Sequence, residues 1–261
     1  IRNSFDIREG NLYVEATLGN ATLALDETMT PGGAESREAY GLVRGPGGSW
    51  VRAGLLLQPF GLRIWDDDAF TRKVSGSNYA SSDLGVELGL ERGRFGMLVA
   101  IANGTAGAAD DNNAKQVSGT VQYLSRPFRL GASGLGNVGP ESTRSGAGGF
   151  FGTRLGRLTL LGEVAWFAER LDKTGRTLQS IVALGELDLL LTRGLNLKLV
   201  YEYHDPFLDV TEEEKTRLRA LAEWFVSPMV NVSIGYLAQM APPQDRQGNL
   251  DALTGELHVF F

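Results

Sequence analysis

The densest group of side chains that could do chemistry lies in the long connection at residues 59–83. It has three successive carboxylates with basic residues on either side: Arg63, Asp66, Asp67, Asp68 and Arg72. Long connections in compact folds are usually functional or disordered. Three interpretations follow. The segment folds inward and narrows a pore, with the carboxylates facing the two arginines; it binds calcium, because clustered carboxylates suit a hard cation; or it is a solvated acidic hairpin held by local ion pairs.

Side chains for nucleophilic, redox or zinc chemistry are scarce. The chain has no cysteine, which excludes thiol catalysis, disulfides, Cys-ligated zinc and covalent haem attachment. Its two histidines, His204 and His258, are expected at opposite rims of the fold, so they cannot share a site. A hydrolase that uses His204 at one rim is the least favoured class. No phosphate loop, dinucleotide fingerprint or zinc motif occurs, and we expect no enzymatic activity, no cofactor and no metal.

Composition limits the class of protein and its partners. The chain has 261 residues, 43% hydrophobic and 21% charged, which is not the composition of a disordered protein. Its formal net charge of −6 argues against nucleic acid as a partner, because phosphate binding needs a basic face. No apolar run is long enough for a transmembrane helix.

Apolar residues recur at every second position through most of the chain. The pattern is clear at residues 84–91, 195–204 and 230–239, where each apolar side chain is followed by a polar or small one. This is the period of a β-strand with one apolar face. Fifteen such segments follow one another from about residue 11 to residue 261, and a sixteenth is expected at residues 5–8.

The connections between these segments alternate between tight turns and long loops. Long connections are expected at residues 28–36, 59–83, 104–114, 138–146, 170–176, 205–214 and 241–250. This is typical of an up-and-down meander with the tight turns at one end. Because bacterial single-chain barrels close with an even number of strands, we predict one all-β domain, residues 1–261. It forms a closed antiparallel transmembrane β-barrel of about sixteen strands, or fourteen if two N-terminal strands merge.

A membrane barrel explains this pattern better than a soluble β-sandwich. A sandwich has irregular connections and would expose a face rich in Lys, Glu and Thr, whereas the second face here is rich in Gly, Ser, Gln and Ala. Lipid cannot hydrogen-bond a backbone, so a sheet in a membrane closes on itself. The apolar side chains would then face lipid, and the others would face a wet lumen.

The expected inward face carries charges of both signs. The candidate pore-lining residues are Arg52, Glu87, Arg129, Arg154, Glu163, Glu186, Asp188, Lys198, Glu202, Arg217, Arg219, Glu223 and Glu256. Charged side chains in a pore set its selectivity; alternatively, each is simply solvated or paired across the lumen. Six inward positions are apolar instead: Leu98, Leu161, Phe167, Val182, Leu184 and Leu237. They indicate a small error of register, or a lumen that packs in part against a plug or another protein.

Two segments resemble Gram-negative outer-membrane β-barrel proteins. Residues 254–261 look like the C-terminal assembly signal of these proteins, with Leu257, Val259 and Phe261 at every second position. Residues 50–63, which end in Pro-Phe-Gly-Leu-Arg and continue into Asp-Asp-Asp-Ala-Phe-Thr-Arg, resemble a strand-to-loop element of porin-like barrels. The resemblance implies a bacterial outer-membrane location, recognition by the barrel-assembly machinery, extracellular long loops and periplasmic short turns.

These observations predict an outer-membrane porin-like channel, in contact with membrane lipid, for passive diffusion of small polar solutes or ions. The alternative is a structural barrel that sheathes or anchors a partner protein in its lumen or at its rim. Some porin-like barrels of this appearance enclose multihaem cytochromes, so a cytochrome conduit or a surface assembly is the form this alternative would take.

Overall fold

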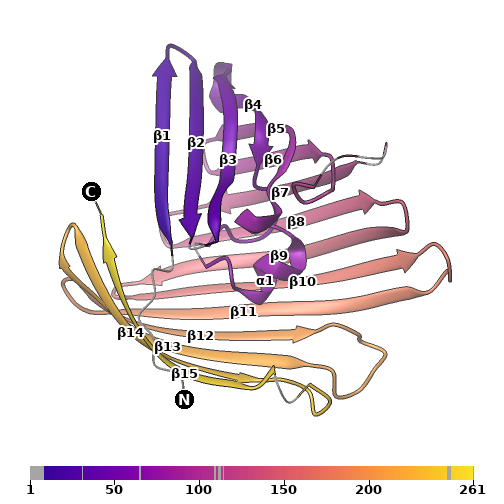
Figure 1. Cartoon of the computed structure of the whole chain (residues 1–261). Coiled ribbons are helices and arrows are strands. Elements are labelled where there is room, and N and C mark those ends of the chain that lie inside the picture. Colours follow the sequence, from indigo (N-terminus) through magenta and orange to yellow (C-terminus); the bar gives the residue numbers. More distant parts are fainter. Residues whose placement is uncertain are drawn as a thin grey trace.

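The computed structural model describes residues 9–260, except residues 31, 65, 109, 111–112, 114 and 246–247. In this part of the chain, fifteen β-strands form one sheet (Figure 1). They are β1 (Gly10–Leu18), β2 (Ala21–Thr30), β3 (Gly33–Arg44), β4 (Ser49–Leu56), β5 (Asp83–Arg92), β6 (Phe95–Ala102), β7 (Gln116–Leu124), β8 (Phe128–Val138), β9 (Ser142–Leu155), β10 (Leu158–Leu171), β11 (Thr177–Thr192), β12 (Leu195–Asp205), β13 (Lys215–Ser227), β14 (Val230–Met240) and β15 (Leu250–Val259). The described helices are α1 (Phe70–Ser75) and the 3-10 turns Pro46–Gly48 and Tyr79–Ser81.

The predicted all-β, up-and-down fold is confirmed. Each strand pairs antiparallel with its neighbours in sequence, in the order β1 to β15. The N-terminal strands stay separate, so the fourteen-strand alternative does not apply. The sixteenth strand expected at residues 5–8 lies outside the described residues.

The sheet curls around a central space, but its two edges are not joined by a strand pair within the described residues (Figure 1). The predicted hydrogen-bonded closure is therefore not found there. In a meander, the first and fifteenth strands run in the same direction, so β1 and β15 could meet only as a parallel pair, unlike all the other neighbours in the sheet.

The connections alternate in position as predicted, although two are shorter than expected. One end has turns at residues 19–20, 45–48, 93–94, 125–127, 156–157, 193–194 and 228–229. At the other end, the expected long loops 28–36 and 138–146 are short: β2 ends at Thr30 and β3 begins at Gly33, and β8 ends at Val138 and β9 begins at Ser142. Strand pairing continues to the pairs Thr30–Gly33 and Val138–Thr143, which leaves few residues for these two connections.

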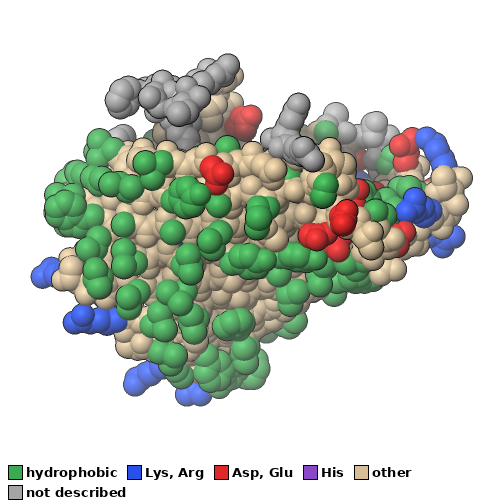
Figure 2. Space-filling view, turned by 90° about the horizontal axis from the view of Figure 1, so that it is seen from below, with side chains coloured by type: hydrophobic (Ala, Val, Ile, Leu, Met, Phe, Trp, Pro, Cys, Tyr) green, Lys and Arg blue, Asp and Glu red, His purple; other side chains and the backbone are tan. Residues whose placement is uncertain are grey.

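The two faces of the sheet differ as the alternation predicted. On β5, Leu84, Val86 and Leu88 are 57%, 47% and 54% exposed on the outer side, whereas Glu87 between them is fully buried on the inner side. Hydrophobic side chains cover much of the outer surface in Figure 2. No helix in the described part of the chain is long and apolar enough to cross a membrane.

Residues 57–82, here called the inner segment, run along the concave side of the sheet and carry α1 (Figure 1). Leu57, Phe60, Leu62 and Ala69 in this segment are almost completely buried. Helix α1 ends at Gly76, whose φ of +72° is readily adopted by glycine and whose N–H bonds the carbonyls of the last turn. The inner segment is therefore part of the packed interior.

Candidate functional site

The curled sheet is here called the wall. Three of its strands, β7, β8 and β10, bind the first residues of the inner segment. Gln58 accepts a hydrogen bond from Ser118 on β7 at 3.1 Å. The N–H of Gly61 donates to Ser133 on β8 at 2.9 Å. The next N–H, that of Leu62, donates to the Glu163 carboxylate on β10 at 2.8 Å. The wall thus satisfies backbone and side-chain polar groups that would otherwise be buried without partners.

Glu202 on β12 is the main polar anchor for the middle of the inner segment. It is fully buried and accepts two hydrogen bonds from Arg217, at 2.7 and 2.9 Å, and one from the Phe70 N–H at 2.7 Å. Arg219 lies 3.1 Å from the same carboxylate. Arg217 also donates to the Asp68 carbonyl at 2.6 Å. One wall carboxylate therefore joins two wall arginines to the start of α1.

A second anchor lies where β3, β4 and β5 meet. Arg52 donates to Glu87, directly opposite it in the strand register, at 2.7 and 3.1 Å. The other side of its guanidinium donates to Glu38 at 2.9 Å. Glu38 also accepts from Arg63 and from the Leu57 N–H, so it holds the inner segment at two points. Glu38 is not among the predicted pore-lining residues, because the expected loop 28–36 ends just before it. The available signal was the two-residue spacing from Glu38 to Tyr40, which places both side chains on one face of β3.

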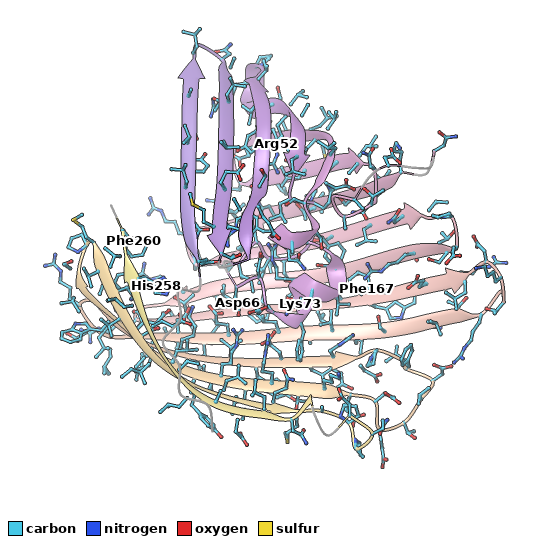
Figure 3. All side chains as sticks on the ribbon, in the orientation of Figure 1. Arg52, Asp66, Lys73, Phe167, His258 and Phe260 are labelled. Carbon is cyan, nitrogen blue, oxygen red and sulfur yellow. The ribbon has the colours of Figure 1, made fainter. Side chains whose placement is uncertain are left out.

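The three successive carboxylates of the inner segment pair with three different cations. Asp66 and Lys73 are labelled on the inner segment in Figure 3. Asp66 pairs with Arg219 on β13, Asp67 with Arg72 at 3.3 Å, and Asp68 with Lys73 at 2.8 Å. The sequence predicted that these carboxylates face Arg63 and Arg72. Only Arg72 does so, through Asp67, whereas Arg63 pairs with Glu38. The side chains diverge, and among the described residues no group of three or more His, Asp or Glu side chains could hold a metal ion.

Burial affects the charges of the inner segment. It raises the pKa of Asp67, although the Tyr79 N–H and the Arg72 guanidinium oppose the shift. Burial lowers the pKa of Arg72, which is 2% exposed. Little water therefore reaches the Arg72 guanidinium, whereas the Asp67 side chain is 31% exposed. The segment as a whole carries three acidic and three basic side chains.

Three of the six apolar inward residues are covered by the inner segment. Phe167 contacts Phe60 with ring centroids 5.5 Å apart, and Val182 belongs to the same buried cluster. Leu184 packs with Ala69 in a second cluster. The other three, Leu98, Leu161 and Leu237, are half-buried outside these clusters. The chain itself thus supplies the filling that these positions indicated.

The remaining charged candidates lie nearer the short-turn end. Lys198 faces three carboxylates, Glu186 at 3.6 Å, Asp188 at 3.9 Å and Glu223 at 4.0 Å. Arg129 donates to Gln122 at 2.8 Å, Arg154 is exposed, and Glu256 lies 3.1 Å from His258. Among the described side chains, none of these residues forms a hydrogen bond or ion pair with the inner segment, so they are separate from its anchors.

The two histidines lie near opposite ends of the strands, as the sequence predicted. His204 is half-buried at the long-loop end of β12, with its ring centroid 6.1 Å from that of Phe70. His258 lies on β15, close to the opposite end (Figure 3). Leu257 and Val259 are exposed on the outer side, and Phe261 lies outside the described residues.

The sequence matches no protein-family model and no curated protein. The structure is similar to the anion-selective porin of Comamonas acidovorans, with a TM-score of 0.74, 14% identity and coverage of 97% of this chain and 89% of that one. It is also similar to a loop-deletion mutant of OmpT from Vibrio cholerae, with a TM-score of 0.73, 11% identity and coverage of 97% of this chain and 90% of that one. A third similar structure is OmpF from Salmonella typhi, with a TM-score of 0.71, 10% identity and coverage of 97% of this chain and 89% of that one. At this identity the likeness concerns the fold: the chain has the strand order and curled sheet of bacterial porins.

Proposed function

We propose that this protein is an outer-membrane channel through which small polar solutes or ions diffuse passively. One observation carries the proposal: a folded segment runs along the polar, concave side of a sheet whose convex side is apolar. A sheet with exposed Leu, Val and aromatic side chains over its outer surface is suited to lipid. A polar inner side is suited to water and to dissolved solutes. The porin-like fold supports the same function.

The inner segment would narrow this channel. It is fixed to the wall at both anchors, so the free cross-section lies between the segment and the parts of the sheet that it does not contact. Arg52, Glu87, Glu163, Glu202 and Arg217 are buried beneath or beside it, and we assign them to positioning the segment. The more accessible candidates would face solutes: Arg129, Arg154, Glu186, Asp188, Lys198, Arg219, Glu223 and Glu256.

The position of the connections supports an orientation in the membrane. The short turns would face the periplasm and the longer connections would face the outside, as in the barrels that the sequence resembles. Membrane lipid would contact the outer side of the sheet, and the barrel-assembly machinery would read the C-terminal strand with Leu257 and Val259.

The sheath for a partner protein is the weaker proposal. A partner protein would shield from water the apolar side chains that face the lumen. Three of these side chains pack against the chain's own inner segment. A channel accounts for the remaining, mostly polar, inner side without a second protein.

Conductance in a planar bilayer tests the proposed function. The refolded protein should insert and give stepwise, long-lived openings, and a heat-unfolded sample of the same preparation serves as the control. Insertion can be followed independently by the change in gel mobility on heating that folded barrels show. A barrel that inserts but gives no openings would contradict the channel and favour the structural role.

A further inference from the structure

The short-turn end of the molecule carries a set of exposed arginines. They are Arg92, Arg94, Arg126, Arg157 and Arg193. Among the described residues, none of them lies within 4.0 Å of a carboxylate. At the other end, two exposed basic residues are paired: Lys173 with Glu141 at 2.6 Å and Arg176 with Asp209 at 3.0 Å. The left margin of Figure 2 shows basic side chains bordering the hydrophobic surface, and the right margin shows both signs together.

Two of these arginines border a shallow groove of about 750 Å³ on the turns that join β5 to β6 and β7 to β8. Its lining residues are Arg94, Tyr123, Leu124, Ser125, Arg126, Pro127 and Phe128. Arg94 donates to the Tyr123 hydroxyl at 3.0 Å. The Tyr123 ring lies 5.1 Å from that of Phe95 and 5.9 Å from that of Phe128, between centroids. The groove thus joins two cationic groups to an aromatic platform.

The surroundings of the groove indicate what kind of ligand fits. Next to the aromatic rings, Met97, Val121 and Leu130 are 42%, 53% and 51% exposed on the outer side of β6, β7 and β8. A ligand in the groove would therefore meet guanidinium groups at one end and an apolar surface at the other. Tyrosine and arginine side chains suit this boundary because each has an apolar body and a polar tip.

We infer that this groove binds an anionic phospholipid of the surrounding leaflet, with Arg94 and Arg126 on the phosphate and the aromatic rings against the glycerol and upper acyl chains. The inference rests on the proposed membrane location. Arginine favours phosphate because its planar group offers several donors. The continuous apolar surface favours a lipid over an acidic protein or a free phosphate.

Native mass spectrometry of the detergent-solubilised barrel with added dioleoylphosphatidylglycerol tests the groove. We expect Arg94→Gln with Arg126→Gln to weaken retention of this lipid about tenfold or more, because two charge-assisted contacts are lost. The matched control is Arg157→Gln with Arg193→Gln, which removes the same charge from neighbouring turns and should retain the lipid as the wild type does. Dioleoylphosphatidylcholine, whose headgroup carries no net charge, should be retained more weakly than dioleoylphosphatidylglycerol.

Three results would overturn the inference. Equal retention by all the variants would exclude the groove, and equal loss in both double variants would mean that only the diffuse charge of the turns acts. Displacement of the lipid by millimolar glycerol 3-phosphate would show that the site takes free phosphate. If the first double variant does not fold, the single variant Arg126→Gln replaces it, and retention unchanged from the wild type would then decide against the groove.

This outcome is separable from the proposed function. Conductance is measured on the same variants in planar bilayers. Wild-type openings without selective lipid retention would overturn the lipid site alone, whereas a barrel that inserts without openings would contradict the channel and leave the lipid measurement valid.

Discussion

Glu202 and Arg217 lie directly opposite each other on β12 and β13 and form two hydrogen bonds, at 2.7 and 2.9 Å. Both also bind the inner segment: the carboxylate accepts from the Phe70 N–H, and the guanidinium donates to the Asp68 carbonyl. The Arg217 guanidinium lies 4.5 Å from the centre of the Phe70 ring. A single cross-strand pair therefore stabilises the wall and holds α1 against it.

Glu202→Gln should loosen the inner segment. Removing the charge leaves two arginines beside a neutral amide in a buried place, and breaking such a pair costs about 3–5 kcal/mol. We expect trypsin to cleave after Lys73, which is exposed on α1, at least tenfold faster than in the wild type, because local opening becomes easier. Single-channel recordings should show more frequent current fluctuations.

The control for this variant is Glu223→Gln on β13. It removes an inward carboxylate that lies 4.0 Å from Lys198 and, among the described residues, forms no hydrogen bond or ion pair with the inner segment. If both variants are cleaved at the same rate, Glu202 is not the anchor of α1.

Phe167→Ala should weaken the apolar contact between the inner segment and β10. Phe167 is 2% exposed and its ring faces that of Phe60, so truncation leaves a cavity, which costs about 3–5 kcal/mol for a buried phenylalanine. The thermal unfolding temperature should fall, and larger neutral solutes should pass in a liposome-swelling assay. Trp166→Ala, at the neighbouring position on the lipid side, should leave solute size unchanged. Equal solute cut-offs for the two variants would argue against a constriction.

Replacing Asp66, Asp67 and Asp68 together by Asn should shift the channel toward anions. The inner segment then keeps three basic side chains without its own carboxylates. A unit charge 4 Å from an ion changes the energy of that ion by about 1 kcal/mol even in bulk water, so a severalfold change in permeability ratio is expected. Reversal potentials in a salt gradient measure it.

The matched control for charge removes three carboxylates from the outer connections, Glu141, Asp172 and Asp209. The same loss of charge far from the inner segment should move the reversal potential less. An unchanged reversal potential in the Asp66–Asp68 variant would defeat the proposed constriction.

Gly61→Ala should destabilise the protein more than Gly76→Ala. Both glycines have positive φ angles, +65° and +72°, which cost other residues about 1–2 kcal/mol. A methyl group at Gly61 would also collide with the Glu163 carboxylate, whereas none of the described atoms lies within 4 Å of one at Gly76. Thermal unfolding of the two variants compares these costs, and equal losses would show that Glu163 yields without penalty.

The sequence by itself determined the strands and their faces. Alternation of apolar and polar residues is a local property, because successive side chains in a strand point to opposite sides. It therefore predicted fifteen strands between residues 11 and 261 and placed Arg52, Glu87, Glu202 and Arg217 on one face. It also indicated that Phe167, Val182 and Leu184 needed a cover.

Only the tertiary structure decided what that cover is and which charges pair. The contacts that fix the inner segment join residues far apart in the chain, such as Leu62 to Glu163 and Asp68 to Arg217, separated by 101 and 149 positions. No local pattern specifies such partners, since they depend on the curvature of the sheet and on the path of residues 57–82. For the same reason Asp66 meets Arg219 rather than Arg63, and Glu38 became visible as an anchor only once β3 and the inner segment were brought together.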